Sequence, residues 1–217
     1  VVGNLSYENG DHGIDNYQSP NNWIIGNTVQ GNGTVGINFE GNTSALGSFG
    51  ATGANNIMSQ NGTTPPSGSW GGNLRFDANS LTGSTTDYNL FYRTDATVQI
   101  IWNNTNYTSL AAFKTAMPTQ EVHGLEGNPL FVNPVSPVLR QTGVPYDGLG
   151  IFGNYYTSAG SPAIDSANAD APSEQEFDVA GNSRIDDPAT PNTGAGVRTY
   201  DDRGAYEYLP AGPSLPV

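Results

Sequence analysis

A short pattern of apolar residues and Asn-Gly turns is written twice within the first 40 residues. The second copy follows the first at an offset of 23 positions, and each copy is too short to hold a helix between its turns. Repeats of roughly 20 to 50 residues are typical of arrays in which each unit packs on the next. The repeat, with short strands broken by turns, therefore predicts a β-solenoid in which each repeat is one coil stacked on the last. Six positions coincide at this offset: Gly3/Gly26, Asn4/Asn27, Asn9/Asn32, Gly10/Gly33, Gly13/Gly36 and Ile14/Ile37.

The pattern continues, with insertions, at Asn56–Gly62, Asn73–Asp77 and Tyr88–Phe91. One asparagine column runs through the copies, and two interpretations of it remain open. Stacked asparagines can hydrogen-bond from rung to rung in a ladder, or asparagine is present because it tolerates a left-handed turn. The column consists of Asn4, Asn27, Asn56 and Asn89.

Three segments are expected to be the same strand of successive copies, namely Gly13–Tyr17, Gly36–Glu40 and Asn73–Asp77. Because side chains alternate along a strand, Ile14, Ile37 and Leu74 are expected to point inward. The alternate positions then form an outward patch of two rows, which is the candidate carbohydrate-binding surface. Its rows are Asp15, Asn38, Arg75 and Tyr17, Glu40, Asp77.

Insertions and a short helix complete the first part of the chain. Thr43–Ala54 and Thr63–Gly72 are rich in Gly, Ser, Thr and Pro and are expected to be loops that could wall a groove. Thr97–Trp102 predicts one more strand. Thr108–Ala116 predicts a helix with Thr108 or Ser109 as its N-cap.

From Glu121 the sequence becomes irregular and acidic, with strand-like runs at Pro129–Val132 and Ser161–Asp165. We expect three parts: repeat coils over residues 1–120, a loop-rich cap over residues 121–208, and a linker-like tail over residues 209–217. The cap is expected to cover the open end of the repeats, because uncovered strand edges pair with other chains.

The excess of acidic residues argues against a nucleic acid as a binding partner. Twenty acidic residues face seven basic ones, a net charge of −13, so a nucleic acid backbone would be repelled. No apolar run is long enough to span a membrane, and cysteine is absent. The chain begins without Met inside a copy of the repeat, which predicts a processed fragment. Its first coil should then be covered by another chain, as an oligomer or fibre, or by a missing N-terminal part.

The repeat units resemble those of right-handed parallel β-helix proteins, the pectate-lyase-like superfamily of bacterial secretion. The resemblance rests on Asn9–Asp15, Asn32–Asn38, Asp87–Tyr92, Gly127–Phe131 and Ser161–Asp165, and on the ending from Asp178 to Glu207. It implies an all-β fold, a right-handed parallel β-helix of about four to five coils with a loop-rich C-terminal cap and one short helix. It also implies an extracellular or cell-surface location.

A narrower similarity links Asn9–Asp15 to the calcium-binding strand of family 9 polysaccharide lyases. That similarity implies Ca²⁺ held by Asp11 and Asp15, although His12 replaces one carboxylate and the lysine base of the family has no counterpart. A lyase reaction on an acidic glycan would then use Arg75 or Ca²⁺ to neutralise the uronate, His12 as base and Tyr17 as acid. Glu40 and Asp77 also sit in one row, at a spacing that a glycosidase pair permits.

Two functions are consistent with these patterns. One is an extracellular structural or self-assembling module that contacts carbohydrate through its outward patch. The other is a calcium-dependent polysaccharide lyase acting on acidic glycans.

Overall fold

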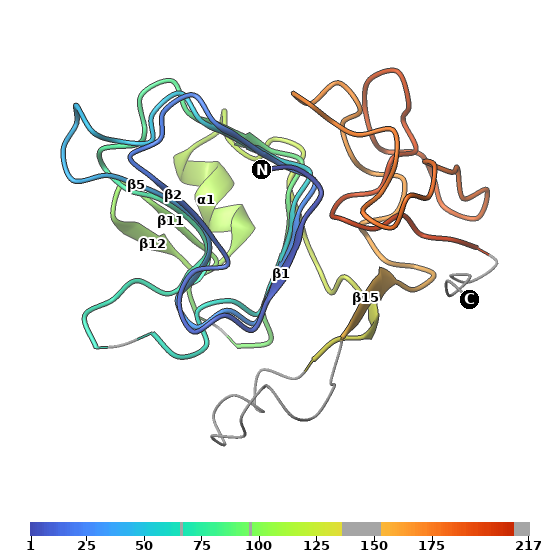
Figure 1. Ribbon diagram of the computed structural model, residues 1–217, viewed down its shortest axis with the longest axis horizontal. Helices are drawn as coiled ribbons and strands as arrows, with labels where there is room; N and C mark the ends of the chain where they lie inside the picture. The colour runs from blue at the N-terminus through green and yellow to red at the C-terminus, as the bar shows by residue number, and fades with distance from the viewer. Residues whose placement is uncertain (66, 96, 136–152, 211–217) are drawn as a thin grey trace.

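The computed structural model describes residues 1–65, 67–95, 97–135 and 153–210. Figure 1 shows three sheets built from the repeats on one side and, beside them, residues 153–210, which we call the C-terminal segment. We name these sheets I, II and III. In all three, the strands of successive repeats lie next to one another and run parallel.

The bounds of the strands are as follows. Sheet I contains β1 (Leu5–Tyr7), β4 (Thr28–Gln30), β7 (Ile57–Ser59), β10 (Leu90–Tyr92) and β13 (Leu125–Glu126). Sheet II contains β2 (Ile14–Tyr17), β5 (Val35–Glu40), β8 (Gly72–Phe76), β11 (Ile100–Trp102) and β12 (Thr105–Tyr107), and β12 runs antiparallel to β11. Sheet III contains β3 (Trp23–Ile25), β6 (Thr52–Ala54) and β9 (Thr85–Asp87), and a separate antiparallel pair joins β14 (Phe131–Asn133) to β15 (Asn154–Thr157).

The predicted right-handed parallel β-helix of four to five coils is wrong. In the described residues the regular structure is mostly strands with one short helix, but the strands divide among several separate sheets, parallel and mixed. These sheets are not arranged as a single closed solenoid. The repeat pattern and the resemblance both misled, because matching turn residues and apolar positions specify local strands and their neighbours, not how whole sheets close on one another.

The predicted register of the repeat strands is confirmed. Ile14 pairs with Ile37, Ile37 with Leu74, and Leu74 with Ile100, so one row of aliphatic side chains crosses sheet II. The next inward row stacks its aromatic rings, with 4.1 Å between the ring centroids of Phe39 and Phe76. These side chains form the main core with apolar residues from sheets I and III.

The predicted short helix is confirmed as α1 (Leu110–Ala116). Ser109 is its N-cap, and the Ser109 hydroxyl accepts a hydrogen bond from the backbone N–H of Ala112. Leu110 and Phe113 are buried in the main core. Across the described residues there is no helix with the length and apolar character needed to cross a membrane.

The predicted asparagine ladder is confirmed. The side-chain amide and backbone N–H of each asparagine donate to the side-chain oxygen of the next, through Asn4, Asn27, Asn56 and Asn89. A second ladder, which the sequence did not predict, runs along the turn before sheet II. It consists of Asn9, Asn32, Asn61, Asn73 and, at its end, Gln99.

The glycine columns of the repeat have two different physical causes. Gly3 and Gly26 both have φ of 63°, a left-handed conformation that glycine adopts without strain. Gly13 and Gly36 lie against the second ladder instead. A Cβ on Gly36 would come within 2.6 Å of the Asn61 amide. Glycine is therefore needed at Gly3 and Gly26 for its backbone conformation, and at Gly13 and Gly36 because there is no room for a side chain.

The C-terminal segment was expected to cover the open end of the repeats. Instead it packs against the outer face of sheet I (Figure 1). Ile57 and Leu90 point outward from this sheet and pack with Ala163. Arg203, which is 2% exposed, donates to the carbonyl oxygens of Asn89, Ser166 and His123. Sheet I is thereby covered on both faces.

Three local expectations need correction. Ser161–Asp165 forms a turn rather than a strand, and Asp165 has a left-handed φ of 52°. Thr52–Ala54, expected within a loop, is strand β6. The strand expected over Thr97–Trp102 is shorter and begins at Ile100. Of the tail expected over residues 209–217, residues 211–217 lie outside the described part of the chain.

Candidate functional site

The first outward row of the sequence patch is assembled as expected on sheet II. Asp15 of β2, Asn38 of β5 and Arg75 of β8 occupy neighbouring positions in register. Two members of the row are covered, since Asn38 is 0% exposed and Arg75 is 7% exposed, whereas Asp15 on the edge strand β2 is exposed. Arg75 is covered in part by Trp70, whose ring lies over its guanidinium.

A chain of hydrogen bonds fixes this row. Arg75 Nη1 donates to Asn38 Oδ1 at 2.9 Å, and Asn38 Nδ2 donates to Asp15 Oδ1 at 3.0 Å. The same Nη1 donates to Glu40 Oε2 at 2.6 Å in a charge-assisted hydrogen bond. Since the Asn38 amide is used at both ends, its orientation and that of its two neighbours are set before any ligand arrives.

His12 lies next to this row on the turn before β2. Its Nδ1 atom is 2.9 Å from Asp11 Oδ1 and also contacts the Thr34 hydroxyl. The Thr34 hydroxyl in turn donates to Asp11 Oδ1 at 2.6 Å. The contacts of Nδ1 hold the imidazole ring against Thr34, and the side chain of His12 is 19% exposed.

An open pocket of about 320 Å³ is lined by His12, Glu40 and Arg75, but not by Asp15 or Asn38. The insertion predicted as a groove wall supplies one side of it, through Gly68, Ser69 and Trp70. The Arg75 guanidinium carbon lies 5.3 Å from the centroid of the Trp70 ring, a cation–π contact. The full lining is Asp11, His12, Thr34, Glu40, Gly68, Ser69, Trp70 and Arg75. We call this the Trp70 pocket.

One polar atom of the pocket lining is left unsatisfied. Arg75 Nε is buried and has no hydrogen-bond partner, although Nη1 of the same side chain is fully engaged. A buried donor without an acceptor costs about 1 to 3 kcal/mol. A ligand that offers an acceptor to Arg75 would recover this energy.

The second outward row does not join the Trp70 pocket as a whole. Glu40 does, but Tyr17 lies outside the lining, and its hydroxyl accepts from Gln18 Nε2 at 3.1 Å. Asp77 is 6% exposed, and its carboxylate accepts from the backbone N–H groups of Gly41 and Asn79. Asp77 therefore holds a turn after β8.

The electrostatics of the pocket are negative. Burial raises the pKa of Asp15 above its ordinary value; the nearby carboxylates of Glu40 and Asp11 add to this effect. The hydrogen bond from Asn38 and the neighbouring His12 act in the opposite direction. The pocket lining holds two carboxylates, Asp11 and Glu40, and one buried guanidinium, which already pairs with Glu40.

Among the described residues, one set of side chains in this neighbourhood could hold a metal ion. His12, Asp15 and Glu40 each offer an atom, and these atoms lie within 4.8 Å of one another. Ca²⁺ prefers six to eight oxygen ligands, and this set supplies one nitrogen and two carboxylates, one of which is bonded to Arg75. The donor set therefore fits Ca²⁺ poorly, and the Ca²⁺ site expected at Asp11 and Asp15 stays a prediction.

Sequence reasoning missed two members of this pocket. Thr34 lies at the position equivalent to Asp11 in the repeat, and Trp70 lies in a Gly/Ser/Pro-rich insertion. The available signal for Trp70 was a large aromatic residue in a segment that otherwise avoids them. Such a residue has no core to enter from a surface loop and is commonly found at binding surfaces.

Comparisons of the chain with protein-family models, with curated protein sequences and with solved structures found no match.

Proposed function

We propose that this protein is a carbohydrate-binding module and that the Trp70 pocket holds an uncharged sugar unit. The observation that carries the proposal is the combination of an aromatic ring, an unsatisfied buried donor and pre-oriented acceptors around one opening. Trp70 supplies the ring, Arg75 the donor, and Glu40 and Asp11 the acceptors. The cell-surface location expected from the sequence belongs to the same proposal.

The chemistry of a sugar hydroxyl suits this arrangement. Each hydroxyl donates one hydrogen bond and accepts two, so neighbouring hydroxyls can accept from Arg75 Nε and donate to the Glu40 carboxylate. The apolar face of a sugar ring can pack on the Trp70 ring, which is 36% exposed as a residue. The excess of carboxylates in the pocket favours a neutral glycan over a uronate.

Binding to neutral and uronate-containing oligosaccharides, measured by isothermal titration calorimetry, tests this proposal. We expect a neutral ligand to bind and Trp70→Ala to weaken it at least about tenfold, because the stacking surface is lost. Trp23→Ala on β3 is the matched control, since Trp23 is also exposed, at 47%, and does not line the pocket. Absence of binding, or equal losses in both variants, would contradict the proposal.

No specific observation favours the lyase alternative. Tyr17, the expected acid, does not line the Trp70 pocket, and the charge of Arg75 is offset by Glu40. An absorbance assay for unsaturated uronate products, with pectate and alginate and with or without Ca²⁺, tests it directly. Product formation that depends on His12 would replace our proposal with the lyase.

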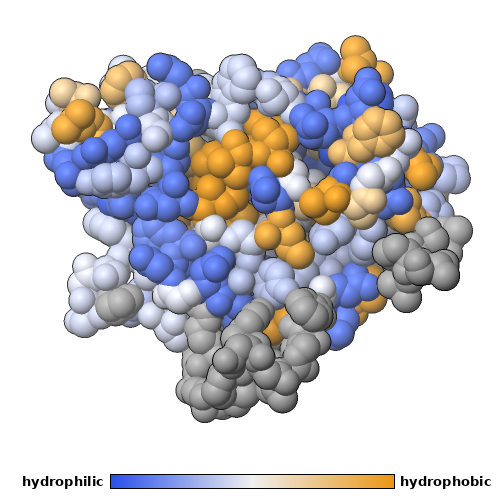
Figure 2. Space-filling view, viewed as in Figure 1, coloured by the Kyte–Doolittle hydropathy of each residue, from blue (hydrophilic) through white to orange (hydrophobic). Residues whose placement is uncertain are grey.

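A specific observation does favour self-assembly as a second function. β1, β2 and β3 are the outermost strands of their sheets at the same end of the repeats. In the view of Figure 1 this end of the repeats faces the reader. Figure 2, drawn in the same view, shows apolar surface in the space that the three sheets enclose. We propose that strands of a further copy, or of a preceding segment, pair with this end. Light scattering that shows only monomers up to high concentration would contradict pairing between copies.

A further inference from the structure

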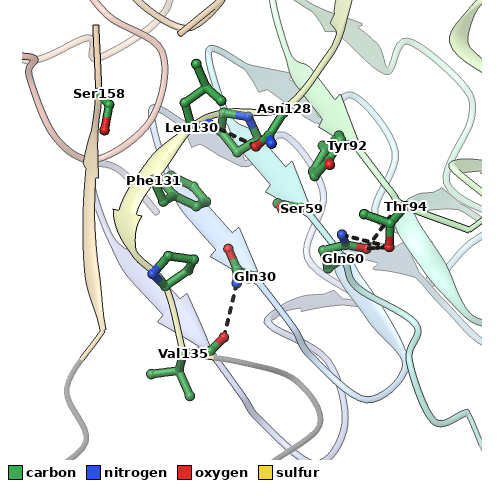
Figure 3. Close-up of a pocket in the computed structure, with 12 residues that line it drawn as sticks. Gln30, Ser59, Gln60, Tyr92, Thr94, Asn128, Leu130, Phe131, Val135 and Ser158 are labelled. Atoms are coloured by element: carbon green, nitrogen blue, oxygen red, sulfur yellow. Dashed lines mark hydrogen bonds between the residues drawn. The ribbon is translucent and has the colours of Figure 1, made fainter.

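A second pocket, of about 530 Å³, opens on the outer face of sheet I. Its floor is a row of three side chains in register, Gln30 of β4, Ser59 of β7 and Tyr92 of β10. Figure 3 shows this row facing Phe131 and Leu130, which form the opposite wall. We call this space the Gln30 groove.

The described residues that line the Gln30 groove are all uncharged, in a chain whose net charge is −13. Hydroxyls and amides alternate with aromatic and apolar side chains. An ionic ligand would find no counter-charge in this lining, so the groove is suited to a neutral one. The lining consists of Gln30, Ser59, Gln60, Tyr92, Thr94, Asn128, Pro129, Leu130, Phe131, Pro134, Val135 and Ser158.

The floor contains a buried acceptor that lacks a donor. Gln30 is 3% exposed, and its Nε2 donates to the carbonyl oxygen of Val135 at 3.3 Å, but its Oε1 has no hydrogen-bond partner. Figure 3 shows the Gln30 amide between Phe131 and the backbone at Val135. Because the unsatisfied atom is an acceptor, a ligand that fits the floor has to donate a hydrogen bond.

The walls are held in place before a ligand enters. Gln60 and Thr94 bond to each other through both the amide and the hydroxyl, as the dashed lines in Figure 3 show. Leu130 has a left-handed φ of 52°, which is strained for a leucine, and Asn128 Oδ1 accepts from its backbone N–H at 3.0 Å. This strained backbone keeps the side chain of Leu130 at the groove, where the residue is 37% exposed.

We propose that the Gln30 groove is a second ligand site that takes an uncharged oligosaccharide, separate from the Trp70 pocket. Sugar hydroxyls are the donors that Gln30 Oε1 lacks, and sugar rings offer apolar faces to Tyr92 and Phe131. A proline-rich peptide is disfavoured, because proline has no backbone N–H to donate. An extended peptide is also disfavoured, since the floor is a sheet face and strand pairing needs a sheet edge.

The test uses an array of neutral oligosaccharides, acidic oligosaccharides and proline-rich peptides, followed by calorimetry on the bound probe. The proposal expects a neutral oligosaccharide to bind, and Gln30→Met to weaken that binding about tenfold by removing the acceptor while keeping the side-chain volume. Gln175→Met is the matched control, because Gln175 is exposed and does not line the groove.

A second variant guards against a folding defect. Leu130→Gly suits the left-handed backbone and removes the wall, so it should also weaken binding while the circular dichroism spectrum stays unchanged. Trp70→Ala should leave binding at the Gln30 groove intact, which separates this proposal from the one for the Trp70 pocket. The proposal is overturned if no neutral probe binds, if only a peptide binds, or if Gln30→Met and Leu130→Gly bind like the wild type.

Discussion

Asn89 donates its side-chain amide to Oε1 of Glu121 at 2.6 Å and its backbone N–H to Oε2 at 3.3 Å. The first asparagine ladder therefore ends on a carboxylate that takes the place of one more asparagine. Glu121 is 0% exposed, and burial raises its pKa from 4.5 to about 7. The hydrogen bonds from Thr86 and Asn89 oppose this shift, and the carboxylate of Asp87 adds to it.

Because the pKa of Glu121 is raised in the folded protein, we expect the free energy of unfolding to fall as the pH rises. With a folded pKa of about 7 and an ordinary value of 4.5, its contribution is complete below pH 4.5 and is lost as the pH rises to about 7. One pKa unit corresponds to about 1.4 kcal/mol, so the loss reaches up to about 3 kcal/mol. Glu207, whose pKa burial raises to about 7, acts in the same direction.

Urea unfolding between pH 4.5 and pH 8 checks this prediction. Glu121→Gln keeps the size of the side chain and cannot ionise, so its free energy of unfolding should depend less steeply on pH than that of the wild type. Equal slopes for the two proteins would mean that Glu121 is not the group responsible.

The middle of the first ladder is predicted to be more sensitive than its exposed end. Asn56 is 0% exposed; its Oδ1 accepts from Asn27, and its Nδ2 donates to Asn89 and to the Ile24 carbonyl. Asn56→Ala leaves these partners unsatisfied and should destabilise the fold by about 2 to 4 kcal/mol. Asn4→Ala, at the exposed end, should cost less than about 1 kcal/mol. Thermal and urea unfolding of both variants measure the difference, and similar losses would contradict the ladder's role.

Close packing against the second ladder predicts that alanine substitution destabilises the protein at one glycine of the repeat and has little effect at another. A Cβ on Gly36 would lie 2.6 Å from the Asn61 amide and from the Asn73 carbonyl oxygen. Gly36→Ala should therefore destabilise the protein by about 1 to 3 kcal/mol, as overpacking does. At Gly10 a Cβ would meet nothing within 4 Å, so Gly10→Ala should leave the unfolding midpoint nearly unchanged. Reversal of this order in chemical denaturation would count against the packing argument.

A buried ion triad in the C-terminal segment predicts a pH-dependent mutant. Arg184 pairs with Glu174 at 2.8 Å and with Glu207 at 2.9 Å, and all three side chains are at most 4% exposed. Arg184→Met leaves two carboxylates buried without a counter-charge and should cost about 3 to 5 kcal/mol at pH 8. The cost should shrink near pH 4.5, where these carboxylates can take up protons. Denaturation at both pH values tests this, and an equal cost at each would contradict it.

The strands and their register were accessible from the sequence because the repeat writes the same side chains at the same positions. The match of Ile14 to Ile37 and Leu74 gave the register of sheet II, and the Asn4 column gave the first ladder. These are short-range consequences of alternation and turn chemistry. The second ladder escaped notice because its last members, Asn73 and Gln99, follow insertions that break the period.

The arrangement of whole segments was not accessible in the same way. The irregular stretch after Glu121 has no period, and its contacts with the repeats connect residues as far apart as Thr28 and Ala205. The candidate site was predicted in part: Asp15, Asn38 and Arg75 meet as expected. Trp70 was missed, because the path of a loop depends on contacts that its own composition does not encode.

The contact of Arg203 with the carbonyl oxygens of Asn89 and His123 has a consequence for the evolution and engineering of this protein. One guanidinium anchors the C-terminal segment to the strands, and the apolar side chains of Ile57 and Leu90 are shielded only when that segment is docked. The two parts of the chain are therefore not interchangeable modules. Grafting either part onto another scaffold would expose the apolar surface that the two parts now bury against each other. On heating, both parts should unfold in one cooperative transition.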